Sequence, residues 1–488
     1  MAPGDSWLIF PLFLLDTAMK TLREHPFVRR HLDGPGGISA LMPIAVPMII
    51  SQIFDTVMTF VDRLYLAYVG KEEIAACMSG GITAWLCMTL FVGIIGYSST
   101  IVAHHYGAKR FRECPLVVYQ GLLLAVLSYP LVLVVASFAS RIFTSGGHDP
   151  DLARLELQYF WYMAFGGILG LLRAALASFF SGIGKTKVIM WANSTALLVN
   201  LVANYVLIYG KLGCPAMGLK GAAIGTLMAS GTMTVVIFVA FLREIRRAPY
   251  SATLADVHYN WRNLRALLRF GLPNGIENLL GMGSFVAVVS SFNSYGANVA
   301  AATTIVFSWD LVSFFPLIGI QVGVCTLVGQ CMGAKNPDGA EQAAYSGFKL
   351  ALSYSGLALI AFCLIPQVLV GVFTPDGVPG LDYSEVRVLA VKMLRLAALY
   401  LMFDGVVLVS SGALRGAGDT FWVMVIGTGI HWLNAIVVMI GVRYLQWPPI
   451  NAWVVFVFAI MLGSMIMFKR FKQGKWKTIT MLEQPETA

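Results

Sequence analysis

Apolar stretches long enough to cross a membrane recur along almost all of this 488-residue chain. A transmembrane helix needs roughly 20 mostly apolar residues. Twelve windows of that kind lie near residues 40–68, 80–103, 115–139, 157–180, 187–209, 221–242, 266–292, 300–329, 345–372, 388–413, 421–442 and 450–468. Only 12% of the residues are charged, against about a quarter in soluble domains. We therefore predict an all-α membrane protein with twelve transmembrane helices, because a backbone in lipid must satisfy its own hydrogen bonds.

Positive charge is distributed unevenly between the two sets of loops that these windows define. The tails and the loops on their side carry Lys20, Arg23, Arg29, Arg30, Lys109, Arg110, Arg112, Lys185, Lys187, Arg243, Arg246, Arg247, Arg262, Arg265, Arg269, Lys335, Arg415, Lys469, Arg470, Lys472, Lys475 and Lys477. The opposite loops carry Lys71, Arg141, Arg154, Lys211, Lys220, Arg387 and Arg443. The positive-inside rule then predicts a multi-pass protein of the cytoplasmic (plasma or inner) membrane, with both termini in the cytoplasm. The net charge of +9 reflects this topology, and we expect no nucleic-acid partner.

Short motifs recur in the two halves of the chain at a fixed spacing. "VPMII" at Val46 reappears as "LPNGI" at Leu272, and "VAHHYGAKR" reappears as "LVGQCMGAKN", both at an offset of 226 residues. Further along, "SGIGKTK" pairs with "RGAGDTF", and Asn200 pairs with Asn434, at an offset of 234 residues. The longer external loop at 373–387 accommodates the difference. Several matches in one register indicate an internal repeat.

The repeat predicts two pseudo-symmetric six-helix halves that enter the membrane in the same direction. The predicted parts are a cytoplasmic segment 1–38, an N-terminal lobe 39–243, a cytoplasmic linker 244–265, a C-terminal lobe 266–470 and a cytoplasmic tail 471–488. Parallel repeats of this kind are typical of secondary transporters, whose substrate cavity lies near the membrane midplane between the halves. The sequence has no GxxxxGK[ST] phosphate loop and no CxxC or Cys/His metal spacing. We therefore expect neither an ATP-driven pump nor a bound cofactor, and a protein that acts as a monomer.

Several motifs resemble the multidrug and toxic compound extrusion (MATE) family. In the first half they are "FVDRLYLAYVGKEEIAA" after Pro47, "HYGAKR", "FSGIGKTK" and "VNLVANYVLIYGKLGCPAMGLKGAAIGT". In the second half they are "GLPNGIENLL", "LVGQCMGAKN" and "LYLMFDGVVLVSSGALRGAGDT". The order and spacing of these motifs over about 430 residues make the resemblance specific. It implies export of bulky organic cations by antiport with sodium ions or protons.

Acidic residues inside the first-half windows are candidates for cation or substrate binding, because a charge at the bilayer centre costs at least about 2.5–3.5 kcal/mol. Asp55 and Asp62 are two helical turns apart and share a face. Asp62 matches the first-half acid of MATE transporters, and Asn200, Asn204 and Thr226 match its polar neighbours. Carboxylate, amide and hydroxyl oxygens suit a sodium ion or a hydrogen-bonded acid. The alternatives are a structural pair of Asp62 with Arg63 and polar contacts between helices.

The second half has its own candidates, at different places in the repeat. Tyr400 and Asp404 are one turn apart, and this Tyr-x-x-x-Asp spacing matches the second-half cation site of the NorM-type branch. Glu277 lies one turn after Pro273, whereas that branch places its glutamate about one turn further on. The resemblance thus implies a possible sodium site at Asp62, Asn200 and Asn204, or at Glu277, Tyr400 and Asp404, and leaves the coupling ion open.

Four further features have a functional and a structural interpretation. Asp310, flanked by aromatic residues, lines the cavity, forms a structural ion pair or is a snorkelling side chain, and the same alternatives hold for Arg173. Pro47 and Pro273 each remove one helical hydrogen bond and mark bend points or static kinks. His104 and His105 are expected to be surface residues at a helix end.

The repeat and the family resemblance together predict a secondary active multidrug efflux transporter rather than an enzyme, with small cationic organic substrates and membrane lipid as its partners. The nearest alternative is a lipid-linked oligosaccharide flippase of the same superfamily, which needs a cavity dominated by cations to hold pyrophosphate. A membrane-embedded enzyme is an alternative from another class. It needs a catalytic cluster such as HExxH, which the sequence does not contain.

Overall fold

The computed structural model describes residues 34–145, 150–253, 258–373 and 384–481. Most of the predicted N-terminal segment and the end of the tail therefore lie outside the described residues. The helices are α3 Ile38–Ala67, α4 Lys71–Gly96, α5 Ser98–Gly107, α6 Glu113–Ala139, α7 Arg141–Ser145, α8 Pro150–Gly182, α9 Lys187–Tyr209, α10 Leu219–Ile245, α11 Trp261–Asn293, α12 Ala297–Gly333, α13 Pro337–Leu364, α14 Pro366–Gly371, α15 Ser384–Ala417, α16 Thr420–Arg443, α17 Pro449–Lys472 and the 3-10 turn η2 Lys475–Thr478.

Twelve helical segments in the described parts of the chain are long and apolar enough to cross a membrane, as the sequence predicts. The second span is interrupted at Tyr97, between α4 and α5, although both pieces belong to one apolar segment, Glu72–Gly107. Local signals fix some of the ends. The side chain of Asn260 accepts a hydrogen bond from the Asn263 backbone N–H at the start of α11 (3.1 Å). Asn336 does the same at the start of α13, where Pro337 follows at a favoured position.

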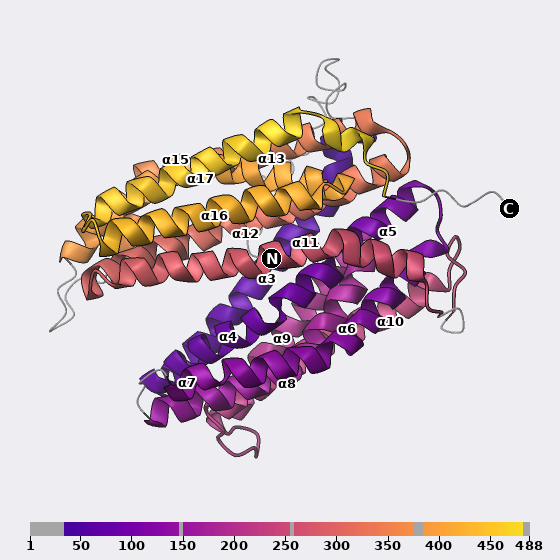
Figure 1. Ribbon diagram of the computed structural model, residues 1–488. Helices are drawn as coiled ribbons and strands as arrows, with labels where there is room; N and C mark the ends of the chain where they lie inside the picture. The colour runs from indigo at the N-terminus through magenta and orange to yellow at the C-terminus, as the bar shows by residue number, and fades with distance from the viewer. Residues whose placement is uncertain (1–33, 146–149, 254–257, 374–383, 482–488) are drawn as a thin grey trace, which may run out of the picture.

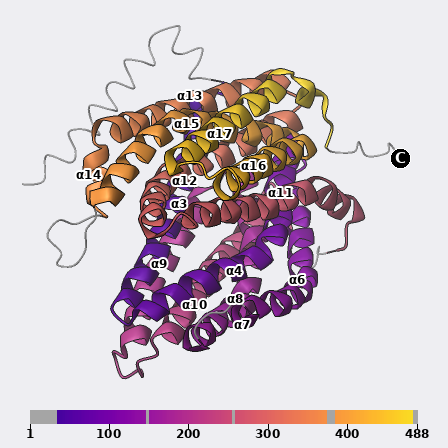
Figure 2. The same cartoon turned by 60° about the vertical axis from the view of Figure 1, so that its left-hand side comes forward.

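The spans form two bundles, and the first helix of each half runs between them. Figures 1 and 2 both place α3 and α11 between the two bundles. Two helix pairs, α3 with α12 and α11 with α4, pack closely. In each pair a glycine, at equivalent positions of the repeat, allows the two backbones to approach. A Cβ on Gly93 would lie 2.6 Å from the Gly275 Cα, and one on Gly319 would lie 2.7 Å from the Ile49 nitrogen. Both pairs repeat at the offset of 226 residues. The pseudo-symmetry of the sequence is therefore also a symmetry of helix packing.

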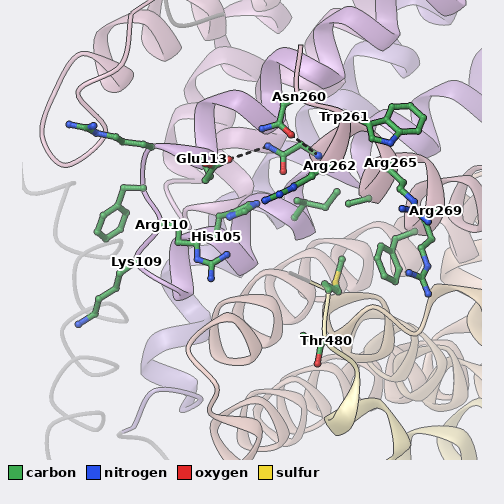
Figure 3. Close-up of a pocket in the computed structure, with 17 residues that line it drawn as sticks. His105, Lys109, Arg110, Glu113, Asn260, Trp261, Arg262, Arg265, Arg269 and Thr480 are labelled. Atoms are coloured by element: carbon green, nitrogen blue, oxygen red, sulfur yellow. Dashed lines mark hydrogen bonds between the residues drawn. The ribbon is translucent and has the colours of Figure 1, made fainter. Parts of the chain in front are cut away.

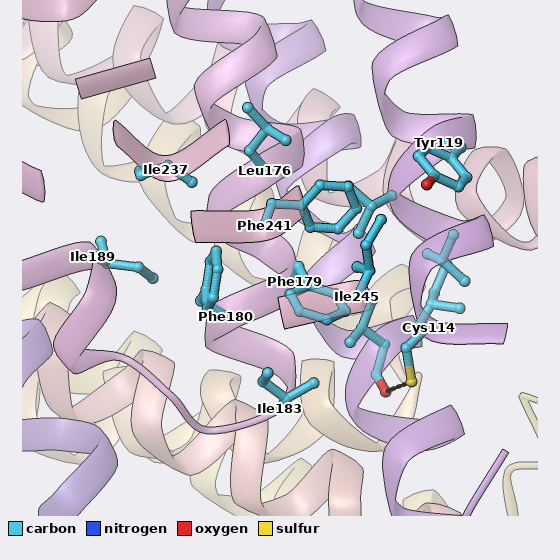
Figure 4. Packing of buried hydrophobic residues seen from close by; sticks show 14 of the residues in the cluster. Cys114, Tyr119, Leu176, Phe179, Phe180, Ile183, Ile189, Ile237, Phe241 and Ile245 are labelled. Carbon is cyan, nitrogen blue, oxygen red and sulfur yellow. Dashed lines mark hydrogen bonds between the residues drawn. The ribbon is translucent and has the colours of Figure 1, made fainter. Parts of the chain in front are cut away.

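Each bundle has an aromatic core that fixes its helices relative to one another. In the N-terminal bundle, Phe179 contacts Phe180 and Phe241 edge-on, with ring centroids 5.3 and 5.0 Å apart. Figure 4 shows this cluster, with Cys114 at its edge. In the C-terminal bundle, the fully buried Trp453 packs against Phe292 and donates its indole N–H to the Met393 carbonyl (3.0 Å). Each half therefore has a packed aromatic core of its own.

A repeated pair of hydrogen bonds joins the bundles at the end where α5 and α12 finish. The His104 Nε2 donates to the carbonyl of Gly416 (2.8 Å), and the Gln330 Nε2 donates to the carbonyl of Gly182 (2.8 Å). His104 and Gln330 are equivalent in the repeat, as are Gly182 and Gly416. We call this pair of contacts the clasp. Figure 1 shows the two bundles converging toward this end of the molecule, where the described chain also finishes.

The clasp corrects one expectation from the sequence. His104 and His105 are not surface residues, since they are only 3% and 5% exposed. Hydropathy places both residues at the C-terminal end of a helix. The opposite half of the protein covers that end of α5, and the sequence pattern alone does not reveal this contact.

Candidate functional site

Asp62 lies near the end of α3 and points into the N-terminal bundle, where it is 7% exposed. The Asn204 amide on α9 donates to its Oδ1 (2.5 Å), and the Thr226 hydroxyl on α10 donates to its Oδ2 (3.1 Å). The three residues therefore come together as the sequence predicts. Each carboxylate oxygen receives one neutral donor, so the negative charge of Asp62 is solvated without being neutralised.

Unpartnered polar atoms surround this carboxylate. Asn200 and Asn204 are fully buried, one turn apart on α9. The Asn200 side chain lies close to Asp62, but neither of its polar atoms, nor the Oδ1 of Asn204, forms a hydrogen bond of good geometry among the described residues. Buried polar atoms are normally satisfied, and unsatisfied ones need an explanation such as an absent ion or water. Together with Asp62 they supply carboxylate and amide oxygens, the donor set that a hard cation prefers.

We call the cluster of Asp62, Asn200, Asn204 and Thr226 the N-lobe site. Two residues that sequence reasoning did not select also border it. The Tyr159 hydroxyl on α8 interacts with the Thr226 hydroxyl and with the charge of Asp62, and Cys77 on α4 lies beside Tyr159. In the sequence Tyr159 is one of several aromatic residues in "LQYFWYM", and nothing there distinguishes it. Gly225 also borders the site and leaves no room for a larger residue, because a Cβ at that position would lie 1.9 Å from the Asn204 Oδ1.

The structural alternative for Asp62, a pair with Arg63, is not what the structure shows. The side chain of Arg63 is exposed, whereas the hydrogen-bond donors to Asp62 are the neutral Asn204 and Thr226. This agrees with helix geometry, since adjacent residues point in different directions.

Asp55 lies two turns from Asp62 on α3 but belongs to a different set of contacts. The Asn193 amide donates to its Oδ2 (3.3 Å) and also to the Ser51 hydroxyl oxygen. Arg173 on α8 supplies a favourable charge interaction with Asp55, and its Nη1 contacts the Met233 sulfur (3.3 Å). The structure thus separates Asp55 from the N-lobe site and gives both it and Arg173 an opposite charge nearby.

In the C-terminal lobe the structure brings Tyr400 and Asp404 of α15 together with Asp310 of α12. Asp404 is 8% exposed and Tyr400 is 1% exposed. The two carboxylates repel each other, and the Tyr400 hydroxyl lies beside Asp310. The Tyr400 hydroxyl oxygen and the Asp310 Oδ1 are buried without a hydrogen bond of good geometry in the described structure. This arrangement, which we call the C-lobe site, has two acids at close quarters and favours an added cation.

Glu277 is not part of the C-lobe site. Its Oε1 forms an ion pair with the Arg415 Nη2 (2.8 Å) near the clasp. Arg415 and Asp404 are on one helix, separated by eleven residues or roughly 16 Å along its axis. Of the predicted set Glu277, Tyr400 and Asp404, the structure therefore keeps the last two and replaces the first with Asp310.

The two remaining candidates are the prolines that are expected to mark bend points or static kinks. Pro47 and Pro273 lie inside α3 and α11, the two helices that cross between the bundles. No group of three or more His, Cys, Asp or Glu side chains that could hold a metal ion occurs in the described parts of the chain.

Curated relatives match most of the chain. A protein of Aliivibrio fischeri named "Multidrug resistance protein NorM" is 28% identical over 78% of this chain and 82% of its own length. A protein of Synechocystis named "Probable multidrug resistance protein NorM" is 29% identical over 80% of this chain and 84% of its own length.

Solved structures share the fold. A structure described as MATE in the straight conformation superposes with a TM-score of 0.80 at 19% identity, covering 91% of this chain and 96% of its own. An outward-facing multidrug resistance MATE transporter of the MOP superfamily gives 0.79 at 20% identity, with coverages of 92% and 98%. A MOP superfamily transporter from Pyrococcus furiosus, described as having reversed pocket polarity, gives 0.82 at 19% identity, with coverages of 92% and 98%.

The MatE family model matches the chain twice, over residues 47–206 and 273–440. These segments include Asp62 and Asp404 and all four residues of the clasp, His104, Gly182, Gln330 and Gly416. The matches cover well over half of the chain, once in each half, which agrees with the twelve-helix repeat seen in the structure. The protein is a multi-pass membrane transporter of the MatE family, related to NorM multidrug resistance proteins.

Proposed function

We propose that this protein exports organic cations from the cell by antiport with sodium ions or protons. The observation that carries the proposal is the presence of two buried acidic sites, one in each lobe, whose contacts in the structure include no basic side chain at hydrogen-bond distance. A buried carboxylate without a basic partner is costly, and a bound cation offsets that cost. Two such sites in separate rigid bundles suit a transporter that exchanges one cation for another.

The proposed orientation places both termini in the cytoplasm of a cell whose cytoplasmic membrane holds the protein. The clasp lies at the end of the molecule that carries the basic loops, so positive-inside topology makes it the cytoplasmic closure. The lobes then separate on the external side, and exposure of the sites to the cytoplasm requires the clasp to open. A ligand shifts this balance only by binding the two states with different affinity.

The coupling ion is the only accessory group in this proposal, and no cofactor or catalytic chemistry is required. Sodium would find oxygen ligands in Asp62, Asn200 and Asn204 or in Asp310, Tyr400 and Asp404, whereas a proton would be shared by the two acids of the C-lobe site. The protein acts as a monomer, because both sites are complete within one chain.

The charge of the deep residues disfavours the flippase alternative. A cavity for lipid-linked pyrophosphate would need lysine or arginine near the midplane. The two proposed sites contain the acids Asp62, Asp310 and Asp404, and Arg173, which also lies within a span, interacts with Asp55. An enzyme is disfavoured because, among the described residues, no cluster of histidine, cysteine and acidic side chains that could hold a metal ion lies at either acid site.

Ethidium efflux from loaded membrane vesicles tests the proposal, with the sodium and pH gradients imposed one at a time. We expect at least one of the two gradients to accelerate efflux from wild-type vesicles relative to vesicles without the protein. Efflux that is independent of both gradients, or absent for a panel of organic cations, would contradict antiport.

A further inference from the structure

A second charged region lies away from the two acid sites, on the loop side of the molecule. It is a cavity of about 520 Å³ between the α5–α6 loop, the start of α11 and the chain after η2. Figure 3 shows the side chains that line it. Among the described residues, six of the lining side chains are cations, three from the α5–α6 loop and three from α11, and one, Glu113, is an acid. The cations are Lys109, Arg110, Arg112, Arg262, Arg265 and Arg269. We call this the basic cavity.

The arginines of α11 are placed by helix geometry. Arg262, Arg265 and Arg269 follow one another at spacings of three and four residues, which puts them on one face of the helix. The Asn260 cap fixes where that helix begins. The one acid is already engaged, because the Asn263 amide on the same first turn donates to the Glu113 Oε2 (3.3 Å). The side chains thus present a concentrated positive charge to whatever enters the cavity.

A buried histidine gives an independent indication of a ligand. His105 borders the cavity, is 5% exposed, and neither of its ring nitrogens has a hydrogen-bond partner of good geometry among the described residues. Figure 3 shows it among the side chains that line the cavity. The Asn263 side chain lies close enough to pair with one ring nitrogen of His105, which leaves the other nitrogen open to a partner. An anion held by the surrounding arginines would supply one.

The edge of the cavity has the features of a membrane interface. Trp261 lines it, and Tyr259 packs beside Trp261 with ring centroids 6.4 Å apart. Both aromatic side chains are largely exposed at the first turn of a transmembrane helix. Tryptophan and tyrosine concentrate where a helix leaves the bilayer, at headgroup depth.

We propose that the basic cavity binds a phosphate-bearing anion, with the phosphodiester headgroup of an acidic lipid as the expected source. Arginine forks match phosphate oxygens in two-point hydrogen bonds, and a basic pocket between helices on the cytoplasmic side is a known form of headgroup site. The lining residues come from the loop after α5, the start of α11 and the tail beyond η2. A bound anion therefore ties the two halves together beside the clasp.

Binding can be measured on the purified full-length protein in neutral detergent, without any gradient. The probes are dioctanoyl phosphatidylglycerol, its zwitterionic phosphatidylcholine analogue and inorganic pyrophosphate. The test variant carries Arg262→Gln, Arg265→Gln and Arg269→Gln together. The matched control carries Arg243→Gln, Arg246→Gln and Arg247→Gln, which remove the same charge from exposed positions outside the cavity.

We expect the test variant to bind phosphatidylglycerol at least about tenfold more weakly than wild type, because each arginine–phosphate contact is worth about a factor of ten. The affinity of the control variant for phosphatidylglycerol should stay within about twofold of the wild-type value. None of the three proteins, wild type, test variant or control variant, should bind phosphatidylcholine tightly. The same pattern with pyrophosphate alone would identify a soluble phosphate as the source. Equal weakening in test and control variants, or no weakening for either anion, would overturn the site. If the triple variant fails to fold, Arg265→Gln alone should still weaken binding several-fold, and unchanged binding would again overturn it.

Discussion

The acids of the two lobes differ in their surroundings more than in their depth. Asp62 and Asp404 are almost equally buried, at 7% and 8% exposed. Asp62 receives hydrogen bonds from the neutral Asn204 and Thr226, whereas Asp404 faces a second carboxylate, that of Asp310. A carboxylate with neutral donors can stay charged while the site is empty, but two carboxylates together need a cation between them. From this difference we propose that the C-lobe site holds the coupling ion and that the N-lobe site binds the exported drug.

Loss of the N-lobe charge should have the largest effect. Asp62→Asn keeps the shape of the side chain but removes the charge that attracts a cation. We expect gradient-driven ethidium efflux to fall by about 100-fold, as for the loss of a charged interaction worth about 3 kcal/mol. Efflux near the wild-type rate from correctly inserted Asp62→Asn protein would remove Asp62 from the mechanism.

Loss of one C-lobe acid should act mainly on ion dependence. Asp404→Asn ends the repulsion with Asp310 and so lowers the need for a cation. We expect the acceleration of efflux by the driving gradient to fall about tenfold. Glu277→Gln is the matched control from the same lobe, since Glu277 pairs with Arg415 instead. If both variants lose ion dependence to the same extent, the C-lobe site is not the one described here.

A backbone contact offers a way to disturb the N-lobe site without touching its charge. Gly225→Ala would place a Cβ 1.9 Å from the Asn204 Oδ1 and so push that amide away from Asp62. We expect a several-fold loss of efflux together with a destabilisation of about 1–3 kcal/mol from overpacking. Gly231→Ala on the same helix is the control, because its nearest neighbour is 3.9 Å away. Equal behaviour of the two variants would show that the Asn204 position does not matter.

The smallest effect should come from Tyr400→Phe, which removes only a hydroxyl beside Asp310. We expect a decrease of about two- to threefold in gradient-dependent efflux, in line with one neutral hydrogen bond. The variant should keep its thermal stability, because the ring contact with Phe456 remains. A loss as large as that of Asp404→Asn would mean that Tyr400 itself carries the ion.

The sequence predicts the twelve spans, the repeat and the contacts of Asp62, because hydropathy and helical periodicity report on single helices and on one face of each. It does not predict that Asp310 meets Asp404, that Glu277 meets Arg415, or that His104 is buried under the opposite half. These contacts depend on how α11, α12 and α15 are rotated and crossed, which is decided by packing across the lobes. Tyr159 was missed for the same reason, since its contact with the site comes from a different helix.

The most direct test of the division between the lobes measures two quantities on the same three proteins. Ethidium affinity is determined at zero gradient, and efflux is determined under a sodium gradient and, separately, under a pH gradient, for wild type, Asp62→Asn and Asp404→Asn. We predict that Asp62→Asn loses at least about tenfold in ethidium affinity. Asp404→Asn should keep its ethidium affinity within about twofold, while the acceleration of its efflux by the gradient that drives wild type falls about tenfold. Equal loss of ethidium affinity in both variants, with the gradient response of Asp404→Asn retained, would contradict the assignment of drug and ion to different lobes.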